Sequence, residues 1–278
     1  MNKTSETESS ALQEKEQRLV ESLRAFGSVL VAYSGGVDSA YLAYTAHRAL
    51  GDRMLAVTAV SPSLSGHQKQ KAESFARQYG IPHLFIESHE FENEAYLANT
   101  PDRCYICKSD LFEHLGKIAA SRRLSSIVHG VNLDDLNDFR PGHKAADEHS
   151  VKGPLLDAGL SKLEIRKLSA MHDLTTSEDP TSPCLASRIP YLERIDLEKI
   201  RQIEKGEDLL RECGFPEMRL RHHGDMARIE VPLQDLPHIV ESEWRSKICS
   251  GMHGLGFKRV TVDLDGFHSG SLSLEFKK

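Results

Sequence analysis

The sequence predicts an α/β protein in which a doubly wound parallel sheet is followed by a smaller α+β domain. Two observations support this fold class. Short apolar, β-branched runs alternate with segments of helical period up to about residue 180. The pattern then changes to a long helix and a hairpin signal. We expect a disordered arm over residues 1–17, an α/β domain over 18–179 and a C-terminal domain over 180–278.

The elements of the α/β domain follow from apolar patterning and from the residues that end each segment. Gly80, for example, stands where a helix over 67–79 would end. The predicted elements are a helix near 13–26, a strand at 29–33, a helix that opens at 38–39, a strand at 53–60, a helix at 67–79, strands at 83–87 and 125–129, and a helix within 153–170.

The C-terminal domain begins after a segment rich in Ser, Thr and Pro over 177–183, which is typical of a linker or an active-site loop. His223-Gly224-Asp225 separates two alternating runs and predicts a hairpin. The predicted elements are a helix at 196–213, strands at 218–222 and 226–231, a helix at 233–250 and a strand at 259–264.

The most informative stretch is the turn after the first strand, which reads Ser34, Gly35, Gly36, Val37, Asp38 and Ser39. Two glycines without Cβ atoms let backbone N–H groups approach an anion closely. The first N–H groups of the following helix carry positive partial charge. The turn therefore predicts a pyrophosphate cradle, although it lacks the Lys of a Walker A loop. An ordinary Gly-Gly turn is the alternative.

Ligands of an open parallel sheet bind at the carboxyl ends of its strands. Ser61 and Gly130 follow the second and fourth strands, so we expect both to line the same nucleotide site. Asp134 and Asp135 come shortly after and suggest Mg²⁺ binding or substrate positioning. An acidic, helix-capping loop is the alternative. Arg140 could face a phosphate or a carboxylate.

Five cysteines in a chain of this kind point to metal binding or catalysis rather than to disulfides. Cys104 and Cys107 form a Cys-x-x-Cys pair, and Cys184 lies far downstream. Cys213 and Cys249 fall in helical, partly apolar segments and are interpreted as core residues. A cluster with three cysteine ligands would leave one iron open to bind and pass on a sulfide.

Other interpretations of the Cys-x-x-Cys pair stay open at this point. It could be a redox pair, or part of a structural zinc site completed by His129 or His143. Arg103 and Lys108 flank the pair, and their positive charges would lower the pKa of both thiols and favour the reactive thiolate.

Arg219 and Arg221 alternate on a predicted strand, so their side chains share one face. Adjacent guanidinium groups repel each other, and an anionic phosphate or carboxylate would relieve that repulsion. Arg228 and Glu230 share a face of the next strand. A solvated charged sheet face is the alternative.

Net charge and hydropathy exclude some classes of protein. A formal net charge of −6 and a pI near 6.2 argue against a large nucleic-acid footprint. No apolar run approaches the length of a membrane span, and residues 1–17 contain no signal-peptide core. We expect a cytoplasmic protein that binds neither membranes nor nucleic acid.

These motifs together resemble the LarE-type ATP-dependent sulfur transferases, which belong to the PP-loop ATP pyrophosphatase superfamily of HUP-like fold. The resemblance covers roughly residues 15–275. The Pro-Cys-Leu-Ala-Ser-Arg-Ile-Pro-Tyr run is its most specific part. The matching segments are 34–39, 101–108, 130–135, 140–142, 183–191, 221–224, 227–231, 256–258 and 269–271.

The resemblance implies a role in making the nickel-pincer nucleotide cofactor of lactate racemase and its relatives. ATP with Mg²⁺ would adenylate a carboxylate of pyridinium-3,5-biscarboxylic acid mononucleotide, and a sulfur nucleophile would displace AMP. One form of the family sacrifices the sulfur of a single cysteine, which Cys184 matches. The other holds a [4Fe-4S] cluster on three cysteines, and Cys104 and Cys107 match its extra positions. We therefore predict the cluster form, as a homo-oligomer working with other proteins of that pathway.

The resemblance also assigns roles to single residues. The expected catalytic residues are Cys184, Lys108, Asp38, Glu207 and Glu230. The expected substrate ligands are Ser187, Arg188, Arg219, Arg221, Arg140 and His268. The sequence departs from the family at Leu192, where Gly is usual, and at Phe267-His268, where Tyr-Arg is usual. Because histidine titrates, His268 would be a weaker cation than arginine.

Three other functions compete with sulfur transfer. A PP-loop tRNA thiolation enzyme can also use three cysteines, but the negative net charge speaks against it. An amide ligase of the NAD-synthetase kind would need no cysteine. A regulator that binds nucleotide or a cluster without catalysis would release no pyrophosphate in response to substrate.

Overall fold

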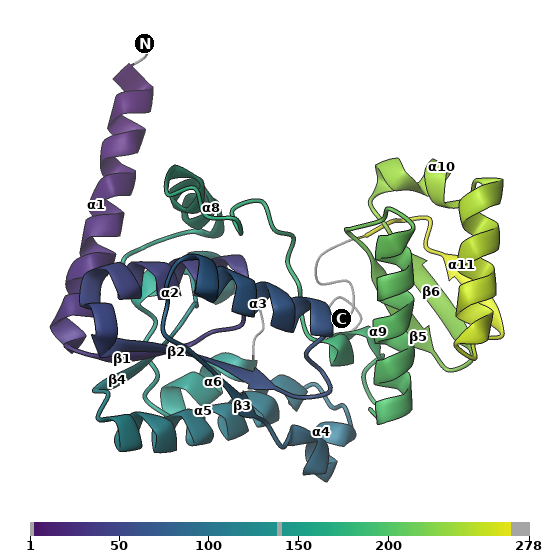
Figure 1. The fold of residues 1–278 in the computed structure, drawn as a ribbon, viewed down its shortest axis with the longest axis horizontal. Coiled ribbons are helices and arrows are strands. Elements are labelled where there is room, and N and C mark those ends of the chain that lie inside the picture. Colours follow the sequence, from purple (N-terminus) through teal and green to yellow (C-terminus); the bar gives the residue numbers. More distant parts are fainter. Residues whose placement is uncertain (1–2, 138–140, 268–278) are drawn as a thin grey trace. The chain divides into compact units, whose positions relative to one another are not determined.

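The computed structural model describes residues 3–137 and 141–267, and the chain folds as two compact units (Figure 1). The first unit comprises residues up to Ser61, Gly66–Glu90 and Cys104–Ser182. The second comprises Pro62–Ser65, Phe91–Arg103 and the chain from Pro183 onward. Two short segments of the N-terminal half therefore fold with the C-terminal unit, which the sequence does not indicate.

The first unit is built on a four-stranded parallel sheet. Its strands are β1 (Val29–Ala32), β2 (Met54–Val60), β3 (His83–Glu87) and β4 (Ser126–His129), in the order β3-β2-β1-β4. Central β1 is fully buried over Val29–Val31, as its β-branched composition predicts. The order places the carboxyl ends of β1 and β4 side by side, and the predicted fold class is confirmed.

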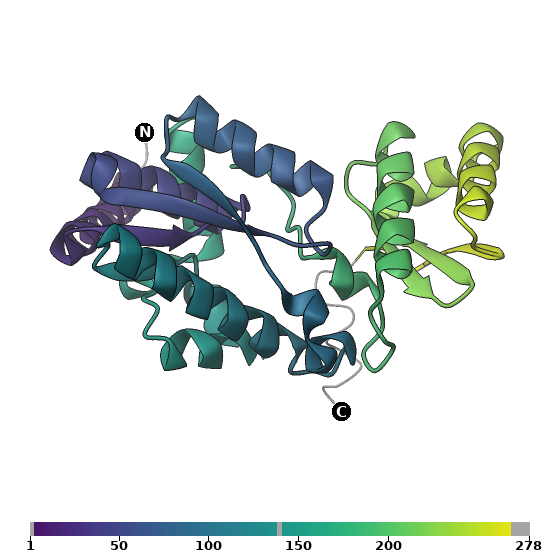
Figure 2. The same ribbon diagram turned by 60° about the horizontal axis from the view of Figure 1, so that its bottom comes forward.

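Helices cover both faces of this sheet (Figures 1 and 2). One face packs on α1 (Lys3–Phe26), α2 (Val37–Leu50), α3 (Gly66–Gln78) and α8 (Lys162–Met171). The other packs on α5 (Arg103–Arg122) and α6 (Pro141–Glu148). The short helices α4 (Glu94–Leu97) and α7 (Pro154–Asp157) lie in the connections.

Helix α1 begins at Lys3, where the sequence predicts a disordered arm. The predicted helix starts only near residue 13. Leu12 already belongs to the core, and Lys15 Nζ lies 2.7 Å from the carboxylate of Glu164. These tertiary contacts stabilise a polar segment whose own pattern does not indicate a buried face.

The second unit contains a three-stranded sheet of β5 (Arg219–His223), β6 (Met226–Glu230) and β7 (Arg259–Val262). The predicted hairpin is present, since β5 and β6 pair antiparallel, whereas β6 and β7 pair in parallel. Helices α9 (Leu197–Glu212) and α11 (Ser242–Gly254) contribute Leu210 and Met252 to the core on the apolar side of the sheet.

The single helix predicted over 233–250 is wrong. The chain forms a turn at Leu233–Asp235, then α10 (Leu236–Ile239), and then α11. Pro237 lies in the first turn of α10, where its missing N–H is tolerated, but it prevents a helix from running through from residue 233. Glu241 is extended and separates the two helices.

Among the described residues, no helix combines the length and the apolar content needed to cross a bilayer.

Alanine substitutions at two helical glycines are predicted to change the free energy of unfolding in opposite directions. A Cβ on Gly206 of α9 would collide with Leu220 Cδ2, whereas a Cβ on Gly116 of α5 meets nothing within 4 Å. Alanine is the better helix former by about 1 kcal/mol. Gly116→Ala should therefore raise the free energy of unfolding by about 0.5–1 kcal/mol, while Gly206→Ala should lower it by about 1–3 kcal/mol. Urea unfolding of both variants checks this, and stabilisation by both would contradict the packing of α9 on β5.

Candidate functional site

The turn between β1 and α2 has the shape of an anion cradle. Gly35 has φ +77°, and a Cβ there would lie 2.9 Å from the Cβ of Ala72, so both conformation and space require glycine. Gly36 precedes α2 and has no side chain that could accept hydrogen bonds from the first N–H groups of the helix. These N–H groups form the positive end of the helix dipole.

Serine hydroxyls fix the form of the turn. Ser39 Oγ donates to the carbonyl of Gly36 at 3.1 Å and accepts from the N–H of Ser34 at 3.2 Å. Gly130, after β4, lies against the same turn, because a Cβ there would be 2.9 Å from the nitrogen of Ser39. Ser61 directly follows β2 at the same edge of the sheet. The structure thus brings the residues predicted for nucleotide binding to one edge.

Asp38, in the first turn of α2, has two differently placed carboxylate oxygens. Oδ2 accepts a hydrogen bond from Lys162 Nζ at 2.5 Å, and Oδ1 is buried with no partner among the described residues. Burial raises the pKa of Asp38, while the charge of Lys162 opposes that shift. A buried carboxylate oxygen beside an anion cradle suits a cation that accompanies phosphate. Nothing in the sequence pairs Lys162 with Asp38, 124 residues away.

The acidic loop after β4 is occupied by capping contacts. Asp134 Oδ2 accepts the N–H of Lys162 at 2.6 Å, and Asp135 Oδ2 accepts the N–H of Asn132 at 3.1 Å. These contacts favour the helix-capping alternative for those oxygens. Across residues 3–137 and 141–267, no group of three or more His, Cys, Asp or Glu side chains is arranged to hold a metal ion. Magnesium binding at Asp134 and Asp135 stays a prediction.

The cysteines fall into distinct environments and form no disulfide with one another. Cys104 and Cys107 lie three residues apart in the first turn of α5, so they share one helix face, and both are partly exposed. Cys184 is also partly exposed and directly precedes a short 3₁₀ turn, Leu185–Arg188, to which its side chain gives no capping hydrogen bond. Cys213 is buried in the core as predicted, whereas Cys249 is only half-buried.

Lys108 follows Cys104 by one helical turn and extends over the backbone of Gly142, where a Cβ would lie 3.0 Å from Nζ. Burial, reinforced by the positive charges of Lys108 and His143, lowers the pKa of His129 to about 3. His129 is therefore neutral in the folded protein at ordinary pH.

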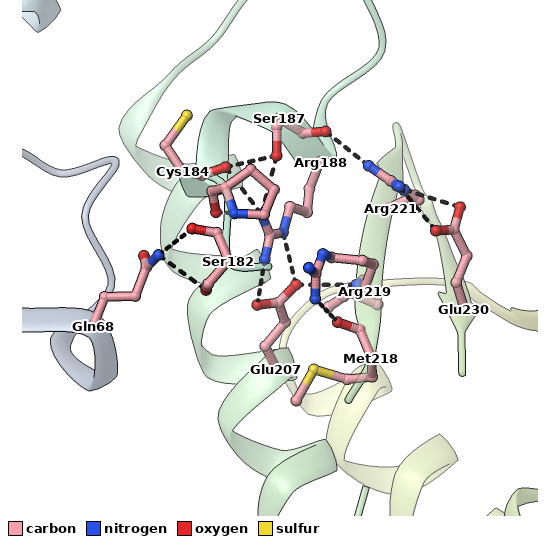
Figure 3. A network of polar contacts seen from close by, with 12 residues as sticks. Gln68, Ser182, Cys184, Ser187, Arg188, Glu207, Met218, Arg219, Arg221 and Glu230 are labelled. Carbon is pink, nitrogen blue, oxygen red and sulfur yellow. Dashed lines mark hydrogen bonds and ion pairs between the residues drawn. The ribbon is translucent and has the colours of Figure 1, made fainter. Parts of the chain in front are cut away.

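The second unit contains a buried polar network around Arg188 (Figure 3). Arg188 and Glu207 are 2% and 1% exposed and form a two-pronged ion pair, with N–O distances of 2.8 and 3.1 Å. Arg188 Nη1 also donates to the carbonyl oxygens of Pro183 at 2.6 Å and Cys184 at 3.0 Å. The Cys184 thiol points away from this network (Figure 3). Arg188 therefore holds the backbone of Cys184 and leaves its sulfur outside the network.

A second pair lies on the hairpin. Arg221 and Glu230 meet at 2.9 Å through both prongs, and Arg221 Nη1 donates to the carbonyl of Ser187 at 2.9 Å. Arg219 donates to the carbonyl of Met218 at 2.6 Å, with its guanidinium 4.6 Å from the ring centre of Phe267. Since Arg219, Arg221 and Glu230 are 6%, 5% and 1% exposed, the alternative of a solvated charged face is wrong for these three residues. Arg228, whose side chain is 29% exposed, remains partly solvated.

The electrostatics of this network favour an added anion. Burial raises the pKa of Glu207, but the charge and hydrogen bonds of Arg188 outweigh burial, so the pKa lies below its usual value. Burial and the charge of Arg188 lower the pKa of Arg219 to about 10, with Arg221 adding to the shift. The cations are thus crowded and desolvated, and a bound phosphate or carboxylate would stabilise them.

Two predicted substrate ligands, Arg140 and His268, lie outside the described residues.

A glycine-shaped cradle after the first strand of a parallel α/β sheet defines a PP-loop nucleotide-binding protein. Comparison with protein families agrees, because the NAD synthase family model matches residues 11–102. The chain is 33% identical over 260 residues to the pyridinium-3,5-bisthiocarboxylic acid mononucleotide synthase of Lactiplantibacillus plantarum, covering 93% of this chain and 94% of that protein. The chain therefore belongs to the LarE-type family.

Two uncharacterised proteins are similar over most of their length. One, from Synechocystis, is 39% identical over 258 residues, which cover 91% of this chain and 96% of that protein. The other, from Methanocaldococcus jannaschii, is 28% identical over 241 residues, which cover 87% of this chain and 91% of that protein.

The close approach of Gly130 to the turn gives a prediction about nucleotide binding. In Gly130→Ala the new methyl group would press on the backbone of Asp38 and Ser39, which cannot give way as a flexible side chain can. We expect MgATP affinity, measured by calorimetry, to fall about tenfold or more, since small displacements of binding groups are costly. Gly116→Ala is the control, and an unchanged affinity in Gly130→Ala would contradict the role of this edge.

The neutral state of His129 predicts a pH dependence of stability. Its pKa of about 3 in the folded protein lies below the unfolded value near 6.5, so between these values only the unfolded chain takes up the proton. Acidification from pH 7.5 to 5 should therefore destabilise the wild type by about 2 kcal/mol more than His129→Gln, with no difference in slope above about pH 8. Urea unfolding at several pH values measures this, and parallel profiles for both proteins would refute it.

Proposed function

We propose that this protein is an ATP-dependent sulfur transferase. It would convert a carboxylate of pyridinium-3,5-biscarboxylic acid mononucleotide to a thiocarboxylate for the nickel-pincer nucleotide. The observation that carries the proposal is the 33% identity to the L. plantarum synthase over 94% of that protein. The cradle, the partly exposed thiols and the buried arginines supply the chemistry that such a reaction needs.

The first half-reaction activates the carboxylate. A carboxylate oxygen attacks the α-phosphorus of ATP, and pyrophosphate leaves. The N–H groups of the cradle, Ser34 and Ser39 would hold the phosphates. Asp38 Oδ1 would face the accompanying Mg²⁺, which offsets the charge on the leaving pyrophosphate.

The second half-reaction replaces oxygen by sulfur. A sulfur nucleophile attacks the carbonyl carbon of the acyl-adenylate, and the bond to the AMP oxygen breaks. Carboxylate alone cannot react in this way because oxide is a very poor leaving group. Lys108 would stabilise the negative charge that develops near the adenylate.

Substrate recognition falls to the second unit. The proposed substrate carries a phosphate and two carboxylates, and Arg219 and Arg221, with Ser187, provide cations and a hydroxyl for them. The lowered pKa of Arg219 reflects the desolvation and crowding that such an anion would relieve. Arg188, Glu207 and Glu230 would position these groups through the ion pairs described above.

The proposed sulfur source involves three cysteines. Cys104, Cys107 and Cys184 would hold a [4Fe-4S] cluster. In support, Cys104 and Cys107 share one helical turn and all three thiols are partly exposed. Against it, the described residues contain no group of three or more His, Cys, Asp or Glu side chains arranged to hold a metal ion. Such a cluster supplies an iron without a protein ligand, to which a transferable sulfide can bind. Sacrifice of the Cys184 sulfur is the second route. We further propose that the protein is a homo-oligomer acting with other proteins of the same pathway.

The match of residues 11–102 to NAD synthase favours one other candidate, an amide-forming ligase. That activity would need the cradle but none of the three cysteines.

The two candidates differ in their response to Cys184→Ala. A sulfur transferase should retain substrate-dependent pyrophosphate release but lose thiocarboxylate product by a factor of about 10³ or more, because its nucleophile is gone. Anaerobic pyrophosphate assays with product mass spectrometry measure both. Cys249→Ala is the control. Thiocarboxylate formation by Cys184→Ala at the wild-type rate would overturn the proposed role.

The iron and labile-sulfide content of the protein, together with its intact mass after turnover, distinguishes a cluster-bound sulfide from the Cys184 sulfur as the source. Cys104→Ala and Cys107→Ala should lose iron and multiple turnover if the cluster route holds. Loss of one H₂S in mass from Cys184 after a single turnover would instead support sacrifice.

A further inference from the structure

We propose that Asn99 and Arg103 are positioning residues that hold the segment carrying Cys184 in the form needed for sulfur transfer. The segment over residues 183–195 is here called the thiol loop, and the Asn99 and Arg103 side chains are called the clasp. The inference rests on the proposed function and adds two residues to its machinery.

Asn99 satisfies three carbonyl groups of the thiol loop. Its side chain is completely buried, and Nδ2 donates to Ile189 at 3.3 Å, Pro190 at 2.8 Å and Glu193 at 3.0 Å. Its Oδ1 accepts from Arg103 Nη1 at 2.6 Å. Asn99 also has φ +55°, a conformation that is costly for most residues. The side-chain amide thus provides the hydrogen bonds that strand or helix partners would give to the carbonyls of a regular element.

Arg103 extends the clasp toward Cys184. It is 4% exposed and donates to the carbonyl of Ala186 at 3.0 Å, two residues after Cys184. Its guanidinium lies 5.5 Å from the ring centre of Tyr191, so Arg103 contacts the thiol loop at both Ala186 and Tyr191. Arg103 also directly precedes Cys104 in the chain.

Backbone contacts complete the hold on the loop. Leu185 N–H donates to Ser63, Leu192 N–H to Asn99 and Ile195 N–H to Leu97, each at 2.9 Å. The segments 62–65 and 91–103 therefore belong to the second unit because they hold the thiol loop. The clasp provides the side-chain part of that hold, and its contact with the carbonyl of Ala186 lies two residues after Cys184.

An exposed ion pair between the same two segments offers a matched control. Arg194 and Glu94 meet at 2.7 Å, but their side chains are 55% and 76% exposed. Exposed pairs contribute little to stability. Removing this pair should leave the loop in place, whereas removing the clasp strands several buried carbonyl groups.

The test measures the reactivity of the Cys184 thiol in the folded, full-length protein free of iron, because a thiolate that binds a cluster could not be alkylated. Asn99→Ala and Arg103→Lys should raise the rate of Cys184 alkylation by iodoacetamide, followed by peptide mass spectrometry, about tenfold, because the loop opens more often. Arg194→Ala should change it less than about twofold. Thiocarboxylate formation should fall about tenfold in the clasp variants, with MgATP affinity unchanged.

The alkylation and turnover rates of the variants decide whether the clasp has the proposed role. Alkylation and turnover within twofold of wild type in both clasp variants would overturn the inference. If Asn99→Ala fails to fold, Asn99→Asp and Arg103→Lys carry the same test, since Asp keeps the acceptor for Arg103 and removes only the donors. Failure of the wild-type protein to make thiocarboxylate would refute the proposed function. Alkylation needs no substrate, so the labelling rates would still test whether the clasp holds the thiol loop.

Discussion

The second unit depends on burying guanidinium groups only where carboxylates meet them with matched geometry. Arg188–Glu207 and Arg221–Glu230 each use two parallel N–H···O contacts, and all four residues are at most 5% exposed. Removing either partner would leave an uncompensated buried charge, which is far more costly than the pair is stabilising. The pairs therefore act less as a source of stability than as a geometric constraint.

That constraint is transmitted to the thiol loop. Each paired arginine has donors left over, and these donate to the carbonyls of Pro183, Cys184 and Ser187. The loop has little regular structure of its own, so its backbone carbonyls must find donors elsewhere. The arginines supply them on one side and Asn99 with Arg103 on the other. The side chain of Cys184 can then stay outside the network while its backbone is fixed.

Local patterns were enough to predict much of the fold and the position of the cradle that the candidate site includes. The β-branched runs predicted all four parallel strands. The Gly35-Gly36 pair marked the cradle in the sequence, and the structure gives Gly35 the positive φ that requires glycine. The break of the predicted helix over 233–250 was also visible in principle, because proline is tolerated in the first turn of a helix but not in the interior, where a helix starting at residue 233 would place Pro237. Alternation on β5 correctly placed Arg219 and Arg221 on one face of the strand, although the alternation could not show whether that face is buried or solvated.

What could not be predicted depends on contacts between distant residues. Lys162 reaches Asp38 across 124 positions, and Asn99 reaches Pro190 across 91, with no periodic signal at either place. A side-chain amide that serves several carbonyls leaves no trace in hydropathy. The roles of such residues become visible only in the folded structure, because their partners are single backbone atoms rather than faces of helices or strands.

Leu192 shows how strongly these distant contacts determine local geometry. The family resemblance leads to glycine here, and the residue indeed has φ +69°, a left-handed conformation that costs leucine about 1–2 kcal/mol. Its N–H donates to Asn99 and the next N–H donates to Pro190. Two backbone hydrogen bonds contribute a net stabilisation of about the same size. The backbone can therefore keep the shape suited to glycine, because Asn99, and not the preference of residue 192, sets the conformation of the loop.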